Sequence, residues 1–389
     1  MKGIKMILFF LTFFLVYGLI NYYIFLRGWQ AIKGVDVSAL KIAFIVAFVF
    51  FNLSYFIARM AGKFLPPAIT DFLAFSGGMW FAGMLYFMLF IIGFDIIRLI
   101  GNGFGLFPDM IKQNWLNVKL YSFVGTLLIV TTIIAIGYFN ANKLKVKHLS
   151  LDIEKPANGY KELTVAVATD IHLGHVIDRS FLQEIIDSIN HLKPDLVLLP
   201  GDIVDEELYP VVHKGLGNLF TQLKPRLGVY AVTGNHEYIG GAEPAVEYLS
   251  KFGINFLRDS VVKIDNAFYI AGREDMMMNT FSGKKRKPLK EILNNQVDGL
   301  PVILMDHQPV SLSEAAENNI DLQISGHTHH GQMWPLNFIT ERVFKLSWGY
   351  KKTGNSHFYV SSGAGTWGPR VRLGNHPEIV YIKLRFSSN

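Results

Sequence analysis

Five short clusters of Asp, Asn and His each follow directly after a short apolar run in this chain. The clusters are Asp170-Ile171-His172, Gly201-Asp202-Ile203-Val204-Asp205, Gly234-Asn235-His236-Glu237, Asp306-His307 and Gly326-His327-Thr328-His329. The apolar runs before them have the length and composition of buried strands. Because the carboxyl ends of neighbouring strands meet at one edge of an α/β sheet, we expect the five clusters to converge there.

The clusters offer oxygen and imidazole nitrogen ligands, and the 389-residue chain contains no cysteine. Such a ligand set suits Mn, Fe, Zn or Mg better than a structural zinc site built from thiolates. Asp202 emerges where Pro200-Gly201 ends an apolar run. A carboxylate there can bridge two cations by giving one oxygen to each. The residues therefore predict a divalent-metal site at the sheet edge, where Asp202 can bridge two ions.

The five blocks resemble the calcineurin-like metallophosphoesterases, whose pattern is DxH, GDxxD, GNHE/D, a lone His and GHxH. All five stand in order between about Leu163 and the end of the chain, and the final stretch resembles a bacterial, membrane-associated branch of that family. The resemblance implies an α/β fold, a four-layer αββα sandwich carrying two metals. It also implies roles for individual residues. Asp170, His172 and His329 would hold the first metal, Asn235, His307 and His327 the second, Asp202 would bridge them, and His236 would lie near the leaving-group oxygen.

This assignment agrees with the chemistry of phosphoester hydrolysis. Two cations about 3.5–4 Å apart neutralise phosphoester oxygens and lower the pKa of a bridging water towards neutrality. The resulting hydroxide is expected to attack phosphorus in line, with a protonated His236 donating to the departing oxygen.

Four further side chains in and near these blocks have open roles. Asp205 either orients His236 or a metal-bound His, or caps the following helix. Glu237 is interpreted as a helix-terminus residue, with a catalytic role as the alternative. His175 and His330 are expected at the rim of the site.

Four apolar stretches in the first third are about as long as a membrane-spanning helix, which needs about 20 residues. They run over Ile4–Leu26, Leu40–Ala58, Phe72–Leu99 and Leu120–Phe139. We expect an all-α transmembrane region with four helices over 1–142, a basic juxtamembrane linker over 143–160 and the phosphoesterase domain over 161–389. The first stretch lacks a small-residue cleavage site, so we interpret it as a retained span.

Charged and small residues in this region bear on orientation and packing. Lys and Arg residues that flank the four spans are nearly balanced between the two sides of the membrane, with a slight excess on the side of the amino terminus. This excess favours a cytoplasmic amino terminus in a multi-pass protein of the cell membrane. After four spans the catalytic domain would then also be cytoplasmic. Asp95 and Arg98, three residues apart, are expected to neutralise each other. Gly77-Gly78 and Gly83 are expected to permit close helix packing.

The rest of the chain alternates between expected helices and strands. Helices are predicted over Phe181–Leu192, His213–Leu223 and Ala242–Phe252. Strands in a meander are predicted over Ile254–Leu257, Val261–Ile264 and Phe268–Ala271, and a second set over Pro301–Met305, Asp321–Ser325, His357–Ser361 and Ile379–Leu384. Two sheets packed face to face, with helices outside, account for this order.

Two segments bear on the substrate. Met276–Lys287 joins flexible apolar side chains to a cationic run, and either contacts acyl chains and phosphates or is a plain surface loop. Gly365–Arg372, with Met333-Trp334, is expected to form a rim that binds a headgroup. Individual substrate-binding residues are not assigned.

The sequence thus predicts a membrane-anchored, dimetal phosphoesterase that cleaves a phosphomonoester or pyrophosphate of a lipid-linked or cell-envelope metabolite. One alternative is a nucleotide or nucleic-acid phosphodiesterase, supported only by Lys284–Lys287. The net charge of +6 is modest and is supplied largely by membrane-flanking residues, so nucleic acid is not an expected partner. The other alternative is a catalytically silent membrane signalling module, against which the complete ligand set argues. The oligomeric state is left open.

Overall fold

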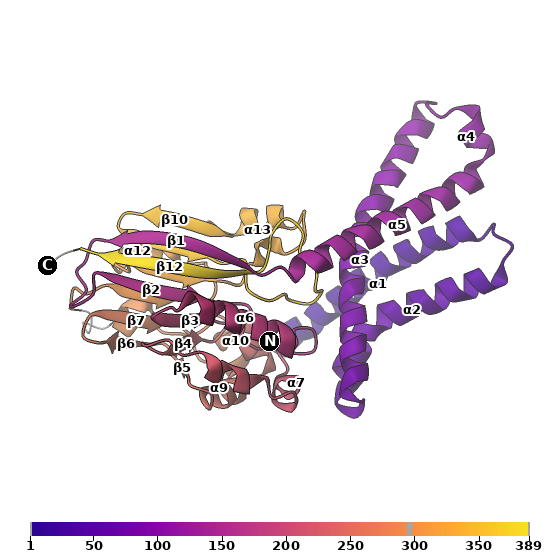
Figure 1. The fold of residues 1–389 in the computed structure, drawn as a ribbon. Helices are drawn as coiled ribbons and strands as arrows, with labels where there is room; N and C mark the ends of the chain where they lie inside the picture. Colours follow the sequence, from indigo (N-terminus) through magenta and orange to yellow (C-terminus); the bar gives the residue numbers. More distant parts are fainter. Residues whose placement is uncertain (1, 294–297, 388–389) are drawn as a thin grey trace. The chain divides into compact units, whose positions relative to one another are not determined.

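The computed structural model describes residues 2–293 and 298–387 and divides into two compact units, 1–136 and 137–389. Four long helices dominate the first unit: α1 (Lys2–Ile32), α2 (Ser38–Ala61), α3 (Pro67–Gly103) and α5 (Trp115–Ala141), the last of which ends inside the second unit (Figure 1). Two short elements, η1 (Gly62–Phe64) and α4 (Asp109–Gln113), lie between them. All four long helices are long and apolar enough to cross a membrane, as the sequence predicted.

Helices of the first unit approach closely where glycine leaves room. A Cβ atom on Gly77 of α3 would lie 2.3 Å from the backbone nitrogen of Tyr55 in α2. Buried polar groups there are also paired, since Trp80 donates to the Asn21 side chain at 2.9 Å and Asn21 donates to the carbonyl of Tyr17 at 2.8 Å. Close approach at small residues and internal hydrogen bonds are how apolar helices associate without water.

The second unit is a sandwich of two six-stranded sheets, with β12 between β1 and β2 in the first of them (Figure 1). The first sheet has, in spatial order, β1 (Lys145–Ile153), β12 (Glu378–Phe386), β2 (Glu162–Val167), β3 (Leu196–Pro200), β4 (Val229–Val232) and β5 (Ile254–Phe256). The second has β10 (Gly349–Thr353), β11 (Ser356–Val360), β9 (Leu322–Ser325), β8 (Val302–Met305), β7 (Phe268–Gly272) and β6 (Ser260–Ile264). Strands β2 to β5 are parallel, as are β7, β8, β9 and β11.

Helices cover the outer face of each sheet. Those near the first sheet are α6 (Arg179–Leu192), α7 (Leu208–His213), η2 (Leu216–Gln222), α8 (Asn235–Gly240) and α9 (Ala242–Ser250). The later ones are α10 (Met278–Ser282), α11 (Leu289–Leu293), α12 (Leu312–Glu317), η3 (His329–Gly331) and α13 (Asn337–Val343).

Strand β3 shows how one apolar run serves two cores. Leu196 and Leu198 belong to the core between the two sheets, whereas Val197 and Leu199 pack with α6 and η2. Successive strand side chains point to opposite faces, so a strand buried on both faces is apolar throughout. With a further core between the second sheet and α11 and α12, the four-layer αββα sandwich predicted from the sequence is confirmed.

The range 143–160, expected as a basic linker, instead contains strand β1. It pairs in parallel with β12 along its whole length, from Lys145 opposite Glu378 to Ile153 opposite Phe386. Most of β1 is exposed because it is an edge strand, so its lysines resemble those of a membrane-proximal stem. Nine residues of this range, half of its length, therefore belong to the first sheet.

Other differences from the expected elements arise from pairing and turns. Strand β5 pairs with β4 in the first sheet and so leaves the expected meander, and β12 joins the first sheet rather than the second set. The exposed edge strand β10 was not predicted. The single helix expected over His213–Leu223 is α7 followed by the 3-10 helix η2, with Gly215 between them at φ +61°.

Candidate metal centre

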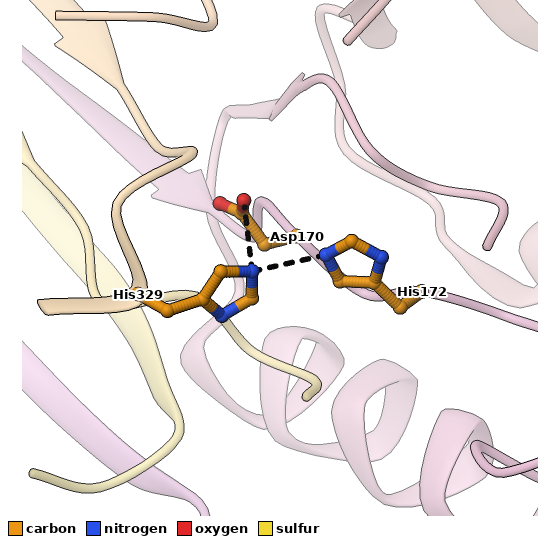
Figure 2. Close-up of side chains that lie close together, drawn as sticks. All are labelled: Asp170, His172 and His329. Carbon is orange, nitrogen blue, oxygen red and sulfur yellow. Dashed lines mark hydrogen bonds and ion pairs between the residues drawn. The ribbon is translucent and has the colours of Figure 1, made fainter. Parts of the chain in front are cut away.

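The first group of predicted ligands consists of Asp170 and His172, which follow β2, and His329, which follows β9. The Nε2 atoms of His172 and His329 lie 3.0 Å apart, and Nε2 of His329 lies 3.4 Å from Asp170 Oδ1 (Figure 2). All three side chains are buried. Two segments far apart in the sequence thus place three ligand atoms around one point.

The second group consists of Asn235, His307 and His327, from the ends of β4, β8 and β9. The side-chain oxygen of Asn235 lies 2.7 Å from Nδ1 of His327 and 3.2 Å from Nε2 of His307. Nδ1 of His307 donates to the carbonyl of Pro200 at 2.7 Å. That hydrogen bond leaves the lone pair of Nε2 facing the group, as is usual for a histidine that ligates a metal.

Asp202 lies between the two groups. Its Oδ2 is 3.0 Å from Nε2 of His307 and 3.9 Å from Nε2 of His172, while Oδ1 accepts the backbone N–H of His236 at 2.9 Å. A single oxygen therefore faces both groups, in place of the expected use of one oxygen for each. Burial alone would raise the pKa of Asp202, but the nearby His307, His236 and His172 hold it well below its usual range.

The backbone of the ligand loops is unusual. Five of the predicted ligands have positive φ angles: Asp170 at 52°, His172 at 54°, Asp202 at 51°, His327 at 71° and His329 at 46°. Residues with a Cβ rarely adopt this left-handed conformation, which costs energy and is concentrated at functional sites. These left-handed residues follow β2, β3 and β9, and Asn235 and His307, after β4 and β8, are not among them.

The residues fit divalent cations. Oδ2 of Asp170 is buried and receives no hydrogen bond within the described residues, and burial raises the pKa of this carboxyl group. Uncompensated burial of a carboxylate is costly. A cation at the first group would compensate Asp170 and separate the two ring nitrogens that now face each other in His172 and His329.

Glu237 holds the loop that carries Asp202. Its carboxylate accepts the backbone N–H groups of Gly234 at 2.7 Å, Asp202 at 3.0 Å and Val204 at 2.8 Å. Glu237 is at position N3 of α8 and accepts the backbone N–H of the N-cap residue Gly234, as in a capping box. This agrees with the helix-terminus interpretation. Glu237 also joins two strand ends, a role that the sequence did not indicate.

Asp205 contacts two histidines rather than capping a helix. Its Oδ1 lies 3.1 Å from Nδ1 of His236 and 3.4 Å from Nδ1 of His172, and the residue preceding α7 is Glu207. The structure therefore favours the orienting role that the sequence left open. A ring nitrogen of His236 lies within 4.8 Å of ligand atoms of His172 and Asp202.

The expected rim is only partly exposed. Arg372 is fully buried and donates to the carbonyls of Ser362 at 2.7 Å and Gly365 at 2.6 Å, with Nη2 3.4 Å from His329 Nδ1. It supports the loop of His329 and is not exposed on the rim that was expected over Gly365–Arg372. Trp367, by contrast, is half exposed, with its ring centroid 6.1 Å from that of His236.

The remaining sequence candidates have defined surroundings. His330 is partly buried against Trp348, with ring centroids 5.1 Å apart, and His175 lies 3.6 Å from Glu207. In the Met276–Lys287 segment, Arg286 pairs with the buried Asp306 at 2.9 Å. Asp306 thus uses its charge in ion pairs beside His307 and is not among the candidate ligands.

Comparison with known proteins places this geometry in a family. Residues 163–331 match the family model described as calcineurin-like phosphoesterase. The chain is 32% identical over 248 residues to an uncharacterized metallophosphoesterase of Aquifex aeolicus, an alignment that covers 63% of this chain and 94% of that protein. The chain belongs to the calcineurin-like phosphoesterases, a family of hydrolases that use two divalent metals.

Two further relatives are matched over part of their length. An uncharacterized metallophosphoesterase of Helicobacter pylori (strain J99) is 33% identical over 230 residues, 58% of this chain and 60% of that protein. A Danio rerio protein named transmembrane protein with metallophosphoesterase domain is 32% identical over 272 residues, 66% of this chain and 62% of that protein. The chain spans about 60% of the length of each. The four apolar helices agree with the membrane association that the second name carries.

Family and site together confirm the metal-dependent phosphoesterase class that was predicted from the sequence.

Proposed function

We propose that the chain hydrolyses a phosphomonoester or pyrophosphate bond at a centre that holds two divalent cations. The observation that carries this proposal is the position of Asp202 Oδ2, between His307 at 3.0 Å and His172 at 3.9 Å. One carboxylate oxygen within reach of two ligand groups is what a shared ligand requires. In this assignment Asp202 is shared, Asp170, His172 and His329 hold one cation, and Asn235, His307 and His327 hold the other.

When bound, two cations supply a nucleophile from water at neutral pH and neutralise charge on the phosphoryl group. The side chains of the protein position that chemistry. Glu237 fixes the Asp202 loop through backbone N–H groups, and Asp205 orients the imidazoles of His172 and His236. His236, whose Nδ1 lies 3.1 Å from Asp205 Oδ1, is the proposed donor of a proton to the departing oxygen.

We further propose that the substrate is lipid-linked or a cell-envelope metabolite and that the catalytic unit is cytoplasmic. Four helices that could span a membrane support the first point. Exposed Met276 and Phe281 in the same segment as Lys284 and Lys285 also support it, because apolar and cationic side chains together suit an anionic lipid surface. The slight excess of Lys and Arg on the amino-terminal side of the spans supports the cytoplasmic orientation.

The test is hydrolysis by the purified full chain in detergent, loaded with Mn. The substrates are an aryl phosphomonoester, an aryl phosphodiester, a nucleotide, phospholipids and UDP-linked lipids. Asp202→Asn and His327→Ala are expected to abolish metal-dependent hydrolysis, while His191→Ala, an exposed histidine at the end of α6, keeps it. Near-native rates in either ligand variant contradict the metal assignment.

The substrate panel separates the finer proposal from the chemistry. A strong preference for a lipid substrate supports the lipid-linked assignment. Activity confined to small aryl esters or nucleotides refutes that assignment and leaves the metal centre standing. A fluorescent protein fused to the carboxyl terminus tests orientation, since such a fusion fluoresces in the cytoplasm, whereas an alkaline phosphatase fusion is active only outside it.

A further inference from the structure

A large cavity lies within the first unit, bordered by α1, α2, α3 and α5. Its volume is about 750 Å³, within the usual range of ligand sites, about 300–1,000 Å³. Most of its wall is apolar and aromatic, including Ile24, Phe44, Phe48, Trp80, Phe87 and Val130. None of the candidate metal ligands lines it.

One end of the cavity carries charge. Arg27, Asp95, Arg98 and Lys119 all line it. Asp95 forms an ion pair with Arg27 and accepts the hydroxyl of Tyr23, and its second oxygen lies 3.4 Å from Arg98. The expected pairing of Asp95 with Arg98 is thus present, but one carboxylate serves two arginines.

Positive charge at this end exceeds negative charge. Within the described residues Lys119 forms no ion pair with a carboxylate, and the buried Nε–H of Arg27 donates no hydrogen bond. Three cations against one carboxylate leave a net positive charge beside apolar walls. Cationic side chains in an apolar region are costly unless an anion pairs with them.

We propose that this cavity binds one anionic phospholipid, with its phosphate at Arg27, Arg98 and Lys119 and its acyl chains along the aromatic wall. The two parts of the cavity match the two parts of such a molecule. A free phosphate would leave the apolar wall unfilled, and a zwitterionic lipid would bring a second cation to an end that already carries excess positive charge. The cavity shares no lining residue with the metal centre, and its proposed ligand does not rest on the proposed hydrolysis.

Native mass spectrometry of the full chain in detergent tests the proposal, with dioleoyl phosphatidylglycerol as the probe. Dioleoyl phosphatidylcholine has the same chains and a zwitterionic headgroup, and inorganic phosphate has no chains. We expect phosphatidylglycerol to bind at least about tenfold more tightly than phosphatidylcholine, because a charge-assisted hydrogen bond contributes about that factor. Inorganic phosphate at millimolar concentration is expected not to displace it.

Variants locate the site. Lys119→Gln and Arg98→Gln are each expected to weaken phosphatidylglycerol binding about tenfold. Lys112→Gln is the matched control, since Lys112 pairs with Asp109 in α4 and does not line the cavity. Ser122→Phe, which adds a ring to the wall, is expected to exclude the lipid. An unchanged unfolding temperature of Lys119→Gln shows that it folds; if that variant is unstable, Arg98→Gln decides.

Equal affinity for the two lipids, or equal binding by Lys119→Gln and Lys112→Gln, overturns the proposal. Asp202→Asn distinguishes this failure from failure of the proposed function. It is expected to lose hydrolysis and to keep the lipid, because Asp202 belongs to the metal centre.

Discussion

Asp205 places one carboxylate oxygen 3.1 Å from Nδ1 of His236 and 3.4 Å from Nδ1 of His172. His172 belongs to the first ligand group, and His236 is the proposed proton donor. One acidic side chain therefore lies beside both a candidate metal ligand and the proposed proton donor. Carboxylates behind metal-bound histidines fix the ring orientation and raise the basicity of the ligand.

Asp205→Asn is expected to lower kcat about 10- to 100-fold, the usual cost of losing such a carboxylate. KM should change little, because Asp205 acts through the two histidines. Steady-state kinetics with an aryl phosphomonoester, together with metal content, measures both effects. Asp187→Asn, on the outer helix α6, is the control. A kcat equal to that of the control would show that Asp205 has no orienting role.

Glu237→Gln is expected to destabilise the protein by about 3 kcal/mol, because a buried charged acceptor of backbone N–H groups is replaced by an amide. The amide NH₂ group would face one of the N–H groups of Gly234, Asp202 or Val204 that Glu237 now accepts. Chemical unfolding in detergent measures the loss. Glu243→Gln provides the comparison, since that side chain is 76% exposed, and equal stability of the two variants would contradict the prediction.

Gly326→Ala is expected to reduce the metal content from two ions per chain to one. A Cβ atom at this position would lie 2.0 Å from Asp170 Oδ2 and 2.4 Å from Thr169 Oγ1, so the carboxylate must leave its place. Elemental analysis of the purified chain measures the loss. Gly125→Ala, whose Cβ would meet nothing within 4 Å, should keep both ions; retention of both by Gly326→Ala would be the contrary result.

The convergence of the candidate metal ligands was predictable because each cluster is local. A strand followed within a few residues by Asp, Asn or His can be read from sequence spacing, and all seven ligand candidates do come together in two groups with Asp202 between them. Contacts between residues that are far apart in the sequence left no such local pattern. Arg372 lies 43 positions from His329 and contacts it only because the chain folds back.

Helix α6 offers a prediction that depends on pH. Asp178 caps the helix by accepting the N–H of Phe181 at 3.0 Å. Burial opposes its ionisation, but the bonds from Phe181 and Ser180 and the charge of Arg370 lower its pKa below the ordinary value. Its contribution to stability is thus complete above the unfolded pKa of about 3.9 and is lost as pH falls through the lower folded value.

Asp178→Ala should therefore cost about 1 kcal/mol at neutral pH. The difference from the native chain should narrow as pH falls below about 3.9, because the native cap becomes protonated. Denaturant unfolding at neutral and acidic pH measures this change. Asp178→Asn retains a cap without charge, so its advantage over Asp178→Ala should not depend on pH. A constant gap between the native chain and Asp178→Ala would refute the linkage.

Strand pairing limits what sequence can predict about the fold. The residues of β5 and β12 indicate strands, but their partners lie in distant segments, and only the folded chain shows that both join the first sheet. The exposed edge strands β1 and β10 lack the apolar pattern of buried strands. The number of layers follows from local patterns, whereas sheet membership depends on contacts between distant segments.

The last turn of α5 is part of the catalytic unit. The carbonyl of Gly137 accepts the backbone N–H of Arg372 at 2.9 Å, and the Asn140 side chain donates to the carbonyls of Arg372 at 3.0 Å and Asn375 at 2.7 Å. Arg372 in turn contacts His329. A version cut at the edge of the sheet, after residue 144, would lose these bonds, so a shortened chain that keeps them has to begin at or before Gly137.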